Sequence, residues 1–120
     1  MNKKRTQRIA SEIHKVVSNC LYNGIKDPRV DTLTTGITEV KVTNDLSFAT
    51  IYVSVIGDEN KKKHTIEGLK KAKGYFKREI GSNVDLRHVP ELIFKLDLSS
   101  ERGQHIENIL EQLKDENDGE

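Results

Sequence analysis

The sequence is poor in the residues that define several protein classes. It has no tryptophan, one cysteine, two prolines and only three tyrosines and three phenylalanines. A single cysteine, Cys20, cannot form an intrachain disulfide, which is typical of a protein kept in a reducing cytosol. No apolar run approaches the roughly 20 residues of a transmembrane helix. The basic start from Met1 to Arg5 leads into a charged segment rather than an apolar one. We therefore expect a cytoplasmic protein with neither a secretory leader nor a membrane span.

Motifs for catalysis and metal binding are also missing. There is no Walker loop, no Gly-x-Ser-x-Gly motif and no carboxylate pair at catalytic spacing. The histidines are far apart and lack metal-ligand spacing with Cys20. They are His14, His64, His88 and His105. Cys20 lies in an apolar stripe, so a small core residue is a better interpretation than a nucleophile. We predict a protein that is not an enzyme and has no metal ion or cofactor.

Charge is present in blocks of alternating sign, although the formal net charge is only +1. Residues 1–30 carry +5 and residues 61–80 carry +6, whereas residues 31–60 carry −4, residues 81–110 carry −2 and residues 111–120 carry −4. With 120 residues the chain has the length of one domain. Two basic blocks on one domain can build a basic face, which indicates a polyanionic partner.

The first basic block has the periodicity of a helix, predicted from about Lys4 to Tyr22. Lys4, Arg8 and Lys15 fall together on the side opposite its apolar stripe. Gly24 is placed to end the helix in a left-handed cap, ahead of a turn at Asp27-Pro28-Arg29. The apolar stripe consists of Ile9, Ile13, Val16, Val17, Cys20 and Leu21.

Strand patterns follow this helix. Residues 37–43 and 48–56 are rich in β-branched side chains, and the turn residues at 43–47 predict an antiparallel hairpin. A third strand is predicted from Glu91 to Leu98. Asp97, at its end, is expected to order a turn at Ser99 and Ser100, one of which caps a last helix. That helix has the apolar face Ile106, Ile109, Leu110 and Leu113.

A lysine interrupts the apolar stripe of the helix predicted over residues 61–80. On a straight helix Lys73 would project into this stripe, where an unpaired ammonium is costly to bury. Lys73 could reach water past the stripe edge, but we favour a kink at Gly74, a poor residue in a helix interior. The motif Ala72-Lys73-Gly74 then divides the segment into two shorter helices, the second ending at Gly81. The stripe consists of Ile66, Leu69, Phe76 and Ile80.

The basic side chains around this kink form a candidate phosphate site. The second helix would present unpaired N–H groups and the positive end of its dipole. Basic side chains add charge-assisted contacts and release counterions from nucleic acid. A solvated helix face is the alternative interpretation. The candidates for RNA contact are Lys4, Arg5, Arg8 and Lys15 on the first helix, and Lys70, Lys71, Lys73, Gly74, Lys77 and Arg78 on the kinked segment.

Short motifs along the chain match one family in order and spacing. They begin with Arg5-Thr6-Gln7-Arg8-Ile9 and Asp27-Pro28-Arg29. They continue with Asn44-Asp45-Leu46-Ser47, Ala49, Tyr52 and Leu69-Lys70-Lys71-Ala72-Lys73-Gly74, and close with Leu86-Arg87-His88-Val89-Pro90-Glu91-Leu92-Ile93-Phe94 and Asp97. From Arg5 to Leu110 the chain therefore resembles the bacterial ribosome-binding factor A family.

The resemblance implies a type II KH-like fold with the order αββααβ, which the periodicities predict independently. It implies binding to the free or immature small (30S) ribosomal subunit and to its 16S rRNA, help in maturing the 5′ region of that rRNA, and importance at low temperature. It further implies an assembly GTPase that releases the factor. RNA-binding KH domains usually carry a Gly-x-x-Gly loop. Here, as in the family, Ala72-Lys73-Gly74 takes its place, so we expect recognition of structured rRNA by shape and charge.

We therefore expect a two-layer α+β, KH-like domain over residues 1–114, with a three-stranded sheet, helices on one face and an added C-terminal helix. Residues 115–120 are expected to be an acidic flexible tail. The expected function is that of a monomeric ribosome biogenesis factor. Two alternatives stay open: a small α+β enzyme acting on a phosphorylated substrate through residues 70–78, and a protein-interaction module whose basic face meets an acidic partner.

Overall fold

The computed structural model describes residues 3–25 and 27–98. The predicted C-terminal helix and the acidic tail at 115–120 lie outside the described residues. The predicted order αββααβ is confirmed. The elements are α1 (Lys3–Asn23), β1 (Thr35–Val42), β2 (Phe48–Val55), α2 (Glu59–Lys71), α3 (Lys73–Asn83) and β3 (Glu91–Leu96).

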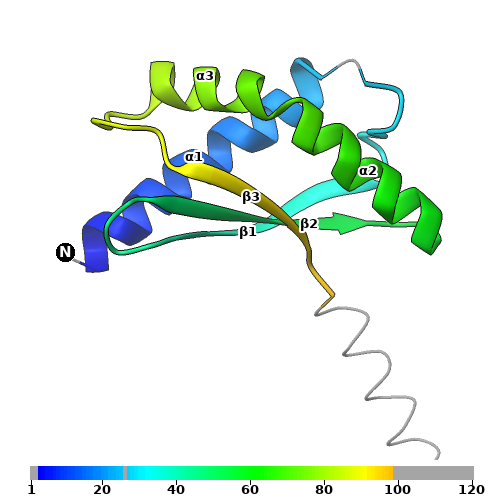
Figure 1. Ribbon diagram of the computed structural model, residues 1–120, viewed down its shortest axis with the longest axis horizontal. Coiled ribbons are helices and arrows are strands. Elements are labelled where there is room, and N and C mark those ends of the chain that lie inside the picture. Colours follow the sequence, from blue (N-terminus) through cyan, green and yellow to red (C-terminus); the bar gives the residue numbers. More distant parts are fainter. Residues whose placement is uncertain (1–2, 26, 99–120) are drawn as a thin grey trace, which may run out of the picture.

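The three described strands form one mixed sheet with the order β1-β2-β3. β1 and β2 pair antiparallel, with Val40 opposite Ile51, so the predicted hairpin is confirmed. β3 lies parallel to β2, with Ile51 opposite Phe94. Parallel neighbours need a long crossover connection, and here α2 and α3 supply it above the sheet (Figure 1).

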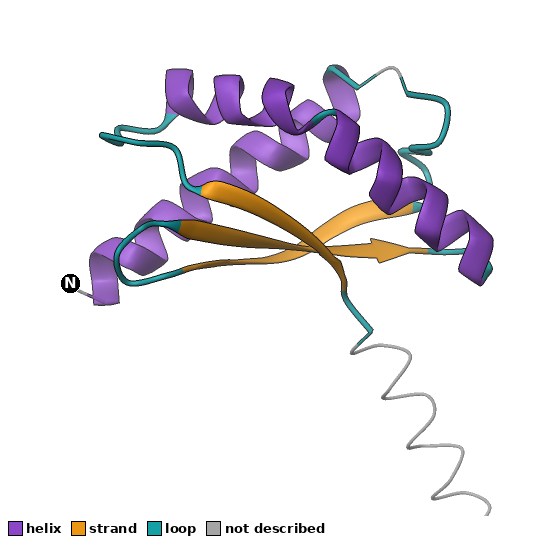
Figure 2. Cartoon of the chain, viewed as in Figure 1, coloured by secondary structure: helices purple, strands orange, loops and turns teal. Residues whose placement is uncertain are grey.

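The three helices of the described residues cover the same face of the sheet (Figure 2), which confirms the predicted two-layer α+β fold. Alternate residues of β2 point toward the helices because side chains of a strand alternate between its two faces. The ring centroids of Phe76 on α3 and Phe94 on β3 lie 5.4 Å apart, and both side chains belong to the buried core between helices and sheet. Removing such apolar surface from water stabilises the fold by about 25 cal/mol per Å². The buried side chains include Ile9, Ile13, Val17, Cys20, Leu21, Ala49, Ile51, Val53, Val55, Leu69, Phe76, Ile80, Leu92 and Phe94.

Gly24 does not cap α1 in a left-handed conformation, so that prediction is wrong. Its φ is not positive, whereas that of Gly57 is. A Cβ built on Gly24 would lie 2.6 Å from Cζ of Tyr75 on α3, far inside van der Waals contact. The missing side chain therefore allows the end of α1 to approach α3 closely.

Gly81 does not end α3, so the predicted helix end is also wrong. α3 continues to Asn83, and the N–H of Val84 still donates to the carbonyl of Ile80 at 2.9 Å. A Cβ on Gly81 would lie 3.3 Å from Val89 in the loop before β3. The small residue at this position thus serves packing against the loop rather than a turn.

The third strand is shorter than predicted and ends at Leu96 rather than at Leu98. Asp97 follows it, and its backbone N–H donates to the carbonyl of Val53 at 2.8 Å. Its carboxylate accepts a hydrogen bond from the hydroxyl of Thr38 on β1. Asp97 therefore ties the end of β3 to the two other strands, and the turn that it was expected to order lies outside the described residues.

Candidate nucleic-acid interface

The helices α2 and α3 meet at Ala72, which is the C-cap residue of α2 and the N-cap residue of α3. Its N–H donates to the carbonyls of Gly68 and Leu69 at 3.2 and 3.1 Å, as at the end of α2. Its own carbonyl accepts from the N–H of Phe76 at 3.1 Å, which opens α3. The prediction of two shorter helices is therefore confirmed. We call the region from Lys70 to Arg78 the α2–α3 joint.

The predicted position of the break, Gly74, is wrong. Gly74 lies in the first turn of α3, and its φ is not positive. A Cβ built on it would meet no neighbouring atom within 4 Å. The change in direction occurs at Ala72, with φ −85° and ψ 4°, so it needs no glycine.

The loop after α1 packs against α2 and fixes the position of the joint. The hydroxyl of Thr65 lies within hydrogen-bond distance of two carbonyls, that of Lys61 at 2.8 Å and that of Arg29 in the loop at 3.2 Å. Arg29 also donates to the Asp27 carboxylate through Nε at 3.0 Å and Nη2 at 2.6 Å. These side-chain hydrogen bonds, followed by the backbone N–H of Arg29, lower the pKa of Asp27 to about 2. The charge of Arg29 is thus largely compensated within the loop.

The basic side chains of the joint fall into two groups. Lys70, Lys71 and Arg78 are exposed. Lys73 and Lys77 are half-buried, and each ammonium lies 3.2 Å from a carboxylate oxygen of Glu91 at the start of β3. Hydrogen bonds from Lys73 and then Lys77 lower the pKa of Glu91. The break therefore leaves Lys73 only partly exposed, and its ammonium is paired with Glu91 rather than buried alone in the apolar stripe.

The first turn of α3 has no side-chain cap, since Ala72 occupies the N-cap position. Its N–H groups and the positive end of the helix dipole therefore stay available to an anion. The exposed cations at the end of α2 lie next to these groups in the chain. This combination can accept phosphate oxygens.

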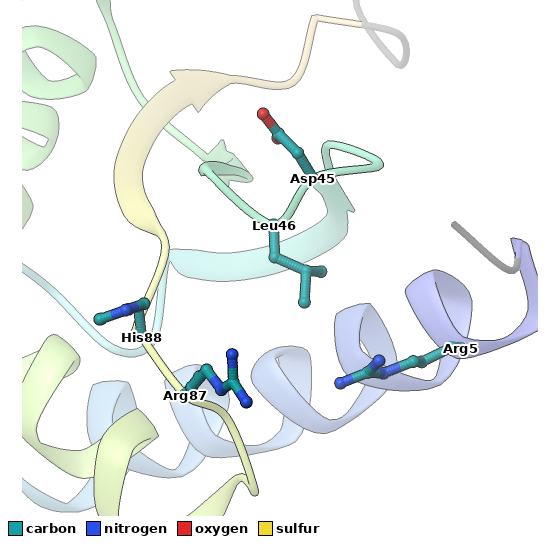
Figure 3. A pocket seen from close by; sticks show the side chains of 5 residues that line it. All are labelled: Arg5, Asp45, Leu46, Arg87 and His88. Atoms are coloured by element: carbon teal, nitrogen blue, oxygen red, sulfur yellow. The ribbon is translucent and has the colours of Figure 1, made fainter.

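A second basic cluster lies in a cavity of about 470 Å³, lined by Arg5, Asp45, Leu46, Arg87 and His88. We call it the Arg5–Arg87 cavity. Arg5 comes from the first turns of α1, Leu46 from the β1–β2 turn and Arg87 from the loop before β3. In Figure 3 the two guanidinium groups point from opposite sides toward the space below Leu46, while the Asp45 carboxylate points away from it. Within the described residues neither arginine side chain makes an ion pair or a hydrogen bond.

Sequence reasoning placed Arg5 among the site residues but did not include Arg87 or His88. The signal available for them was their place in the motif from Leu86 to Phe94. A single arginine in a loop has no periodicity that assigns it to a face, so its proximity to Arg5 required the fold.

The predicted basic residues do not form one patch. Lys4, Arg8 and Lys15 are exposed on α1, but they belong to a helix that begins beside the cavity and ends beside the joint (Figure 1). Eighteen residues at 1.5 Å each separate Arg5 from Asn23 by about 27 Å along the helix axis. The structure therefore divides the predicted site into a cluster at each end of α1.

Other chemistry is limited in the described part of the chain. Cys20 is buried, and its pKa is raised by desolvation and then by Glu79, which fits the predicted core role. Among residues 3–25 and 27–98 no group of three His, Cys, Asp or Glu side chains could hold a metal ion. In the same residues no helix is both long and apolar enough to cross a membrane.

The fold and the two clusters together define a small α+β domain that carries a broken, lysine-rich helix pair above a mixed sheet. The family model of ribosome-binding factor A matches residues 5–110. The chain therefore belongs to the ribosome-binding factor A family, as its motifs predict. This is a family of ribosome-binding factors, so the prediction of a non-enzymatic protein is confirmed as well.

Relatives and solved structures agree with this assignment. The chain is 61% identical over 120 residues to ribosome-binding factor A of Finegoldia magna, covering 100% of this chain and 99% of the relative. It is 47% identical over 113 residues to that of Clostridioides difficile, covering 94% and 87%. An NMR structure of a Thermotoga maritima protein suggested to be a ribosome binding factor A matches with TM-score 0.70 and 30% identity, covering 79% of this chain and 89% of that one.

A homology model of Thermus thermophilus ribosome binding factor A, fitted into a cryo-EM map of its complex with the 30S subunit, shares the fold. Its TM-score is 0.59 at 18% identity, and the match covers 75% of this chain and 92% of that one.

Proposed function

We propose that this chain binds the small ribosomal subunit through rRNA and assists its assembly. The observation that carries the proposal is the α2–α3 joint, where an uncapped helix N-terminus stands beside exposed Lys70, Lys71 and Arg78. Membership in the family supports it, as does the complex with the 30S subunit formed by the Thermus thermophilus relative.

Recognition is expected to rest on phosphate positions and rRNA shape rather than on stacked bases. Sequence-specific binding of single strands usually needs exposed aromatic platforms. At the joint Phe76 is fully buried in the core, and the Tyr75 ring lies against Gly24. Backbone N–H groups and lysines instead suit the phosphates of a folded RNA.

Several finer features of the function belong to the same proposal. The factor acts on immature 30S subunits, helps to mature the 5′ region of 16S rRNA, and is most needed at low temperature, as the family resemblance implies. It works in the cytoplasm as a monomer, and a GTPase releases it. The binding domain of the proposal spans residues 1–114, and the acidic segment at 115–120 lies outside it.

Cosedimentation with purified small subunits tests the proposal. We expect comigration that nuclease treatment abolishes, because the ligand is rRNA. We also expect binding to weaken by several orders of magnitude between about 50 and 200 mM salt if six or more phosphates are contacted. Binding that survives nuclease treatment and does not change over this salt range would contradict the proposal and favour an acidic protein partner.

A further inference from the structure

We propose that the Arg5–Arg87 cavity is a second RNA site, distinct from the α2–α3 joint, that holds one nucleotide of rRNA. The phosphate lies between the guanidinium groups of Arg5 and Arg87, and the base or ribose lies against Leu46. The proposal rests on the proposed function because its ligand is part of the same rRNA.

The two arginines make the cavity positively charged, which favours an anionic ligand. Arginine stays protonated throughout the physiological pH range, so two guanidinium groups that face one space repel each other. The carboxylate of Asp45 points away from them (Figure 3) and makes no ion pair with either; the Ser47 N–H at 3.0 Å and the Thr43 hydroxyl at 2.9 Å hold it in that direction. Both arginines are exposed, and none of the described residues forms an ion pair with either of them. A phosphate has enough oxygens to accept a pair of hydrogen bonds from each of the two guanidinium groups.

Leu46 supplies the second part of the ligand's chemistry. It is the only non-glycine residue of the described part with a positive φ, 62°, an unfavourable conformation for a bulky side chain. The hydrogen bonds of the turn hold Leu46 in this conformation. The N–H of Leu46 donates to the carbonyl of Thr43 at 2.9 Å, and the N–H of Thr43 donates to the carbonyl of Phe48 at 2.9 Å. The result is an apolar side chain over a cationic space (Figure 3). A sugar or base joined to a phosphate matches both surfaces.

The size of the cavity and its surroundings favour a nucleotide within a chain. About 470 Å³ lies within the roughly 300–1,000 Å³ typical of small-ligand sites. Arg8, one helical turn further along α1, is exposed and continues the positive charge beyond the cavity. An RNA backbone can therefore enter and leave past this helix.

Binding of small subunits at low salt tests the shared phosphate. The variants are Arg5→Gln, Arg87→Gln and their combination. We expect each single change to weaken binding by about 10-fold. The combination should weaken binding by far less than the product of the two single effects, because one remaining arginine no longer holds the phosphate in place. Independent, multiplicative effects or no effect in the single variants would overturn the proposal. The double variant Lys63→Gln/Lys95→Gln removes two exposed charges elsewhere and is expected to change binding by less than about 3-fold.

A titration of the isolated protein tests the role of Leu46. Uridine monophosphate and inorganic phosphate are added separately, and NMR follows the side-chain resonances of Arg5 and Arg87. We expect the nucleotide to bind at least several-fold more tightly than phosphate, and Leu46→Ala to remove that preference. Equal binding of both ligands by the parent would overturn the nucleotide assignment. Arg87→Lys keeps the positive charge but cannot donate two parallel hydrogen bonds. Its affinity is therefore expected to lie between those of Arg87→Gln and the parent.

These two experiments separate failure of the proposal from failure of the proposed function. If the parent chain does not bind subunits, the ribosomal function is wrong, whereas the titration still decides whether the cavity takes a nucleotide. If the parent binds subunits and the arginine variants bind equally well, only the cavity proposal is wrong. Melting temperatures of all variants identify any change that acts through folding.

Discussion

The α2–α3 joint and the Arg5–Arg87 cavity lie at opposite ends of α1. They differ in whether nearby carboxylates pair with their basic side chains. At the joint, Glu91 pairs with Lys73 and Lys77, and nearby Asp27 pairs with Arg29. In the cavity the arginines have no partner among the described residues. Counts of charge along the chain do not show this difference: residues 61–80, which contain most of the joint, carry +6, whereas the cavity draws Arg5 from a block of +5 and Arg87 from a block of −2. The charge available to a ligand thus depends on which carboxylates the fold brings near.

The largest effect is expected from removing the joint's charge. Replacing Lys70, Lys73, Lys77 and Arg78 with Gln should weaken subunit binding by one or more orders of magnitude and flatten its salt dependence, because phosphate contacts are lost. Stability should fall only modestly, since Lys70 and Arg78 are exposed and the ion pairs of Lys73 and Lys77 with Glu91 lie near the surface, where such a pair contributes about 0–1 kcal/mol. Cosedimentation and thermal melting measure the two effects. Binding as tight as that of the parent would show that the wrong face was chosen.

Two half-variants sharpen this prediction. Lys70→Gln/Arg78→Gln removes exposed charges, whereas Lys73→Gln/Lys77→Gln removes the same number of charges paired with Glu91. We expect the exposed pair to account for more of the lost affinity. The reverse order would mean that rRNA displaces Glu91 from its lysines.

The next effect concerns packing at the joint end of α1. Gly24→Ala places a methyl group against the Tyr75 ring, and overpacking of this kind typically costs about 1–3 kcal/mol. Gly74→Ala is the matched control, because its Cβ meets nothing within 4 Å and alanine is better than glycine in a helix by up to about 1 kcal/mol. Denaturant unfolding compares the two variants. Equal stability would contradict the close approach of α1 and α3.

The position of Gly24 also separates the two sites. Displacing Tyr75 moves α3 at the joint but leaves the other end of α1 in place. Subunit binding by Gly24→Ala should therefore weaken more than its binding of uridine monophosphate in the cavity.

A smaller effect of opposite sign is expected from Glu91→Gln. The change releases Lys73 and Lys77 from their carboxylate partner, so subunit binding at low salt should become tighter by about 2- to 10-fold, as expected for one added positive charge near phosphates. Glu91→Asp keeps the charge and serves as the control. Unchanged or weaker binding by Glu91→Gln would show that these lysines serve the fold alone.

The smallest effect is the acid dependence of the Asp27–Arg29 pair. The pKa of Asp27 is lowered from 3.8 to about 2, so the pair stabilises the fold fully above the ordinary value and loses that contribution as pH falls toward 2. The melting temperature of the parent should exceed that of Asp27→Asn at pH 5, and the difference should shrink between about pH 4 and pH 2.

A control for this titration comes from the cavity. The difference in melting temperature between the parent and Arg87→Gln should not follow the same course, because a guanidinium does not titrate there. A constant difference for Asp27→Asn down to pH 2 would contradict the pairing.

Local patterns predicted most of the fold. The alternation in β2 and the three- and four-residue spacing in α1 follow directly from strand and helix geometry. The conflict between Lys73 and the apolar stripe predicted the break, because burial of a charge is costly wherever the helix lies. These features depend on residues that are close in the sequence, so they can be recognised without the structure.

Features that depend on distant residues were missed. Gly24 follows a helix, which suggests a cap, but its role is set by Tyr75 on another element. The break was placed at Gly74 on propensity, whereas packing places it at Ala72. Glu91 lies on β3 but pairs with lysines of the joint. Arg87 lies in the loop before that strand and lines the same cavity as Arg5. No local pattern contains these distances.

The parallel pairing of β2 with β3 also sets the order in which the chain can fold. α1 and the β1–β2 hairpin are complete by Val55, but Ile51 finds Phe94 only after the whole crossover has been synthesised. Non-local parallel pairing forms slowly, and chains fold from the N-terminus during translation. Because Glu91 arrives with this last strand, we expect the nascent chain to carry Lys73 and Lys77 uncompensated until the sheet closes. The chain is then most basic while it is still attached to the ribosome that makes it.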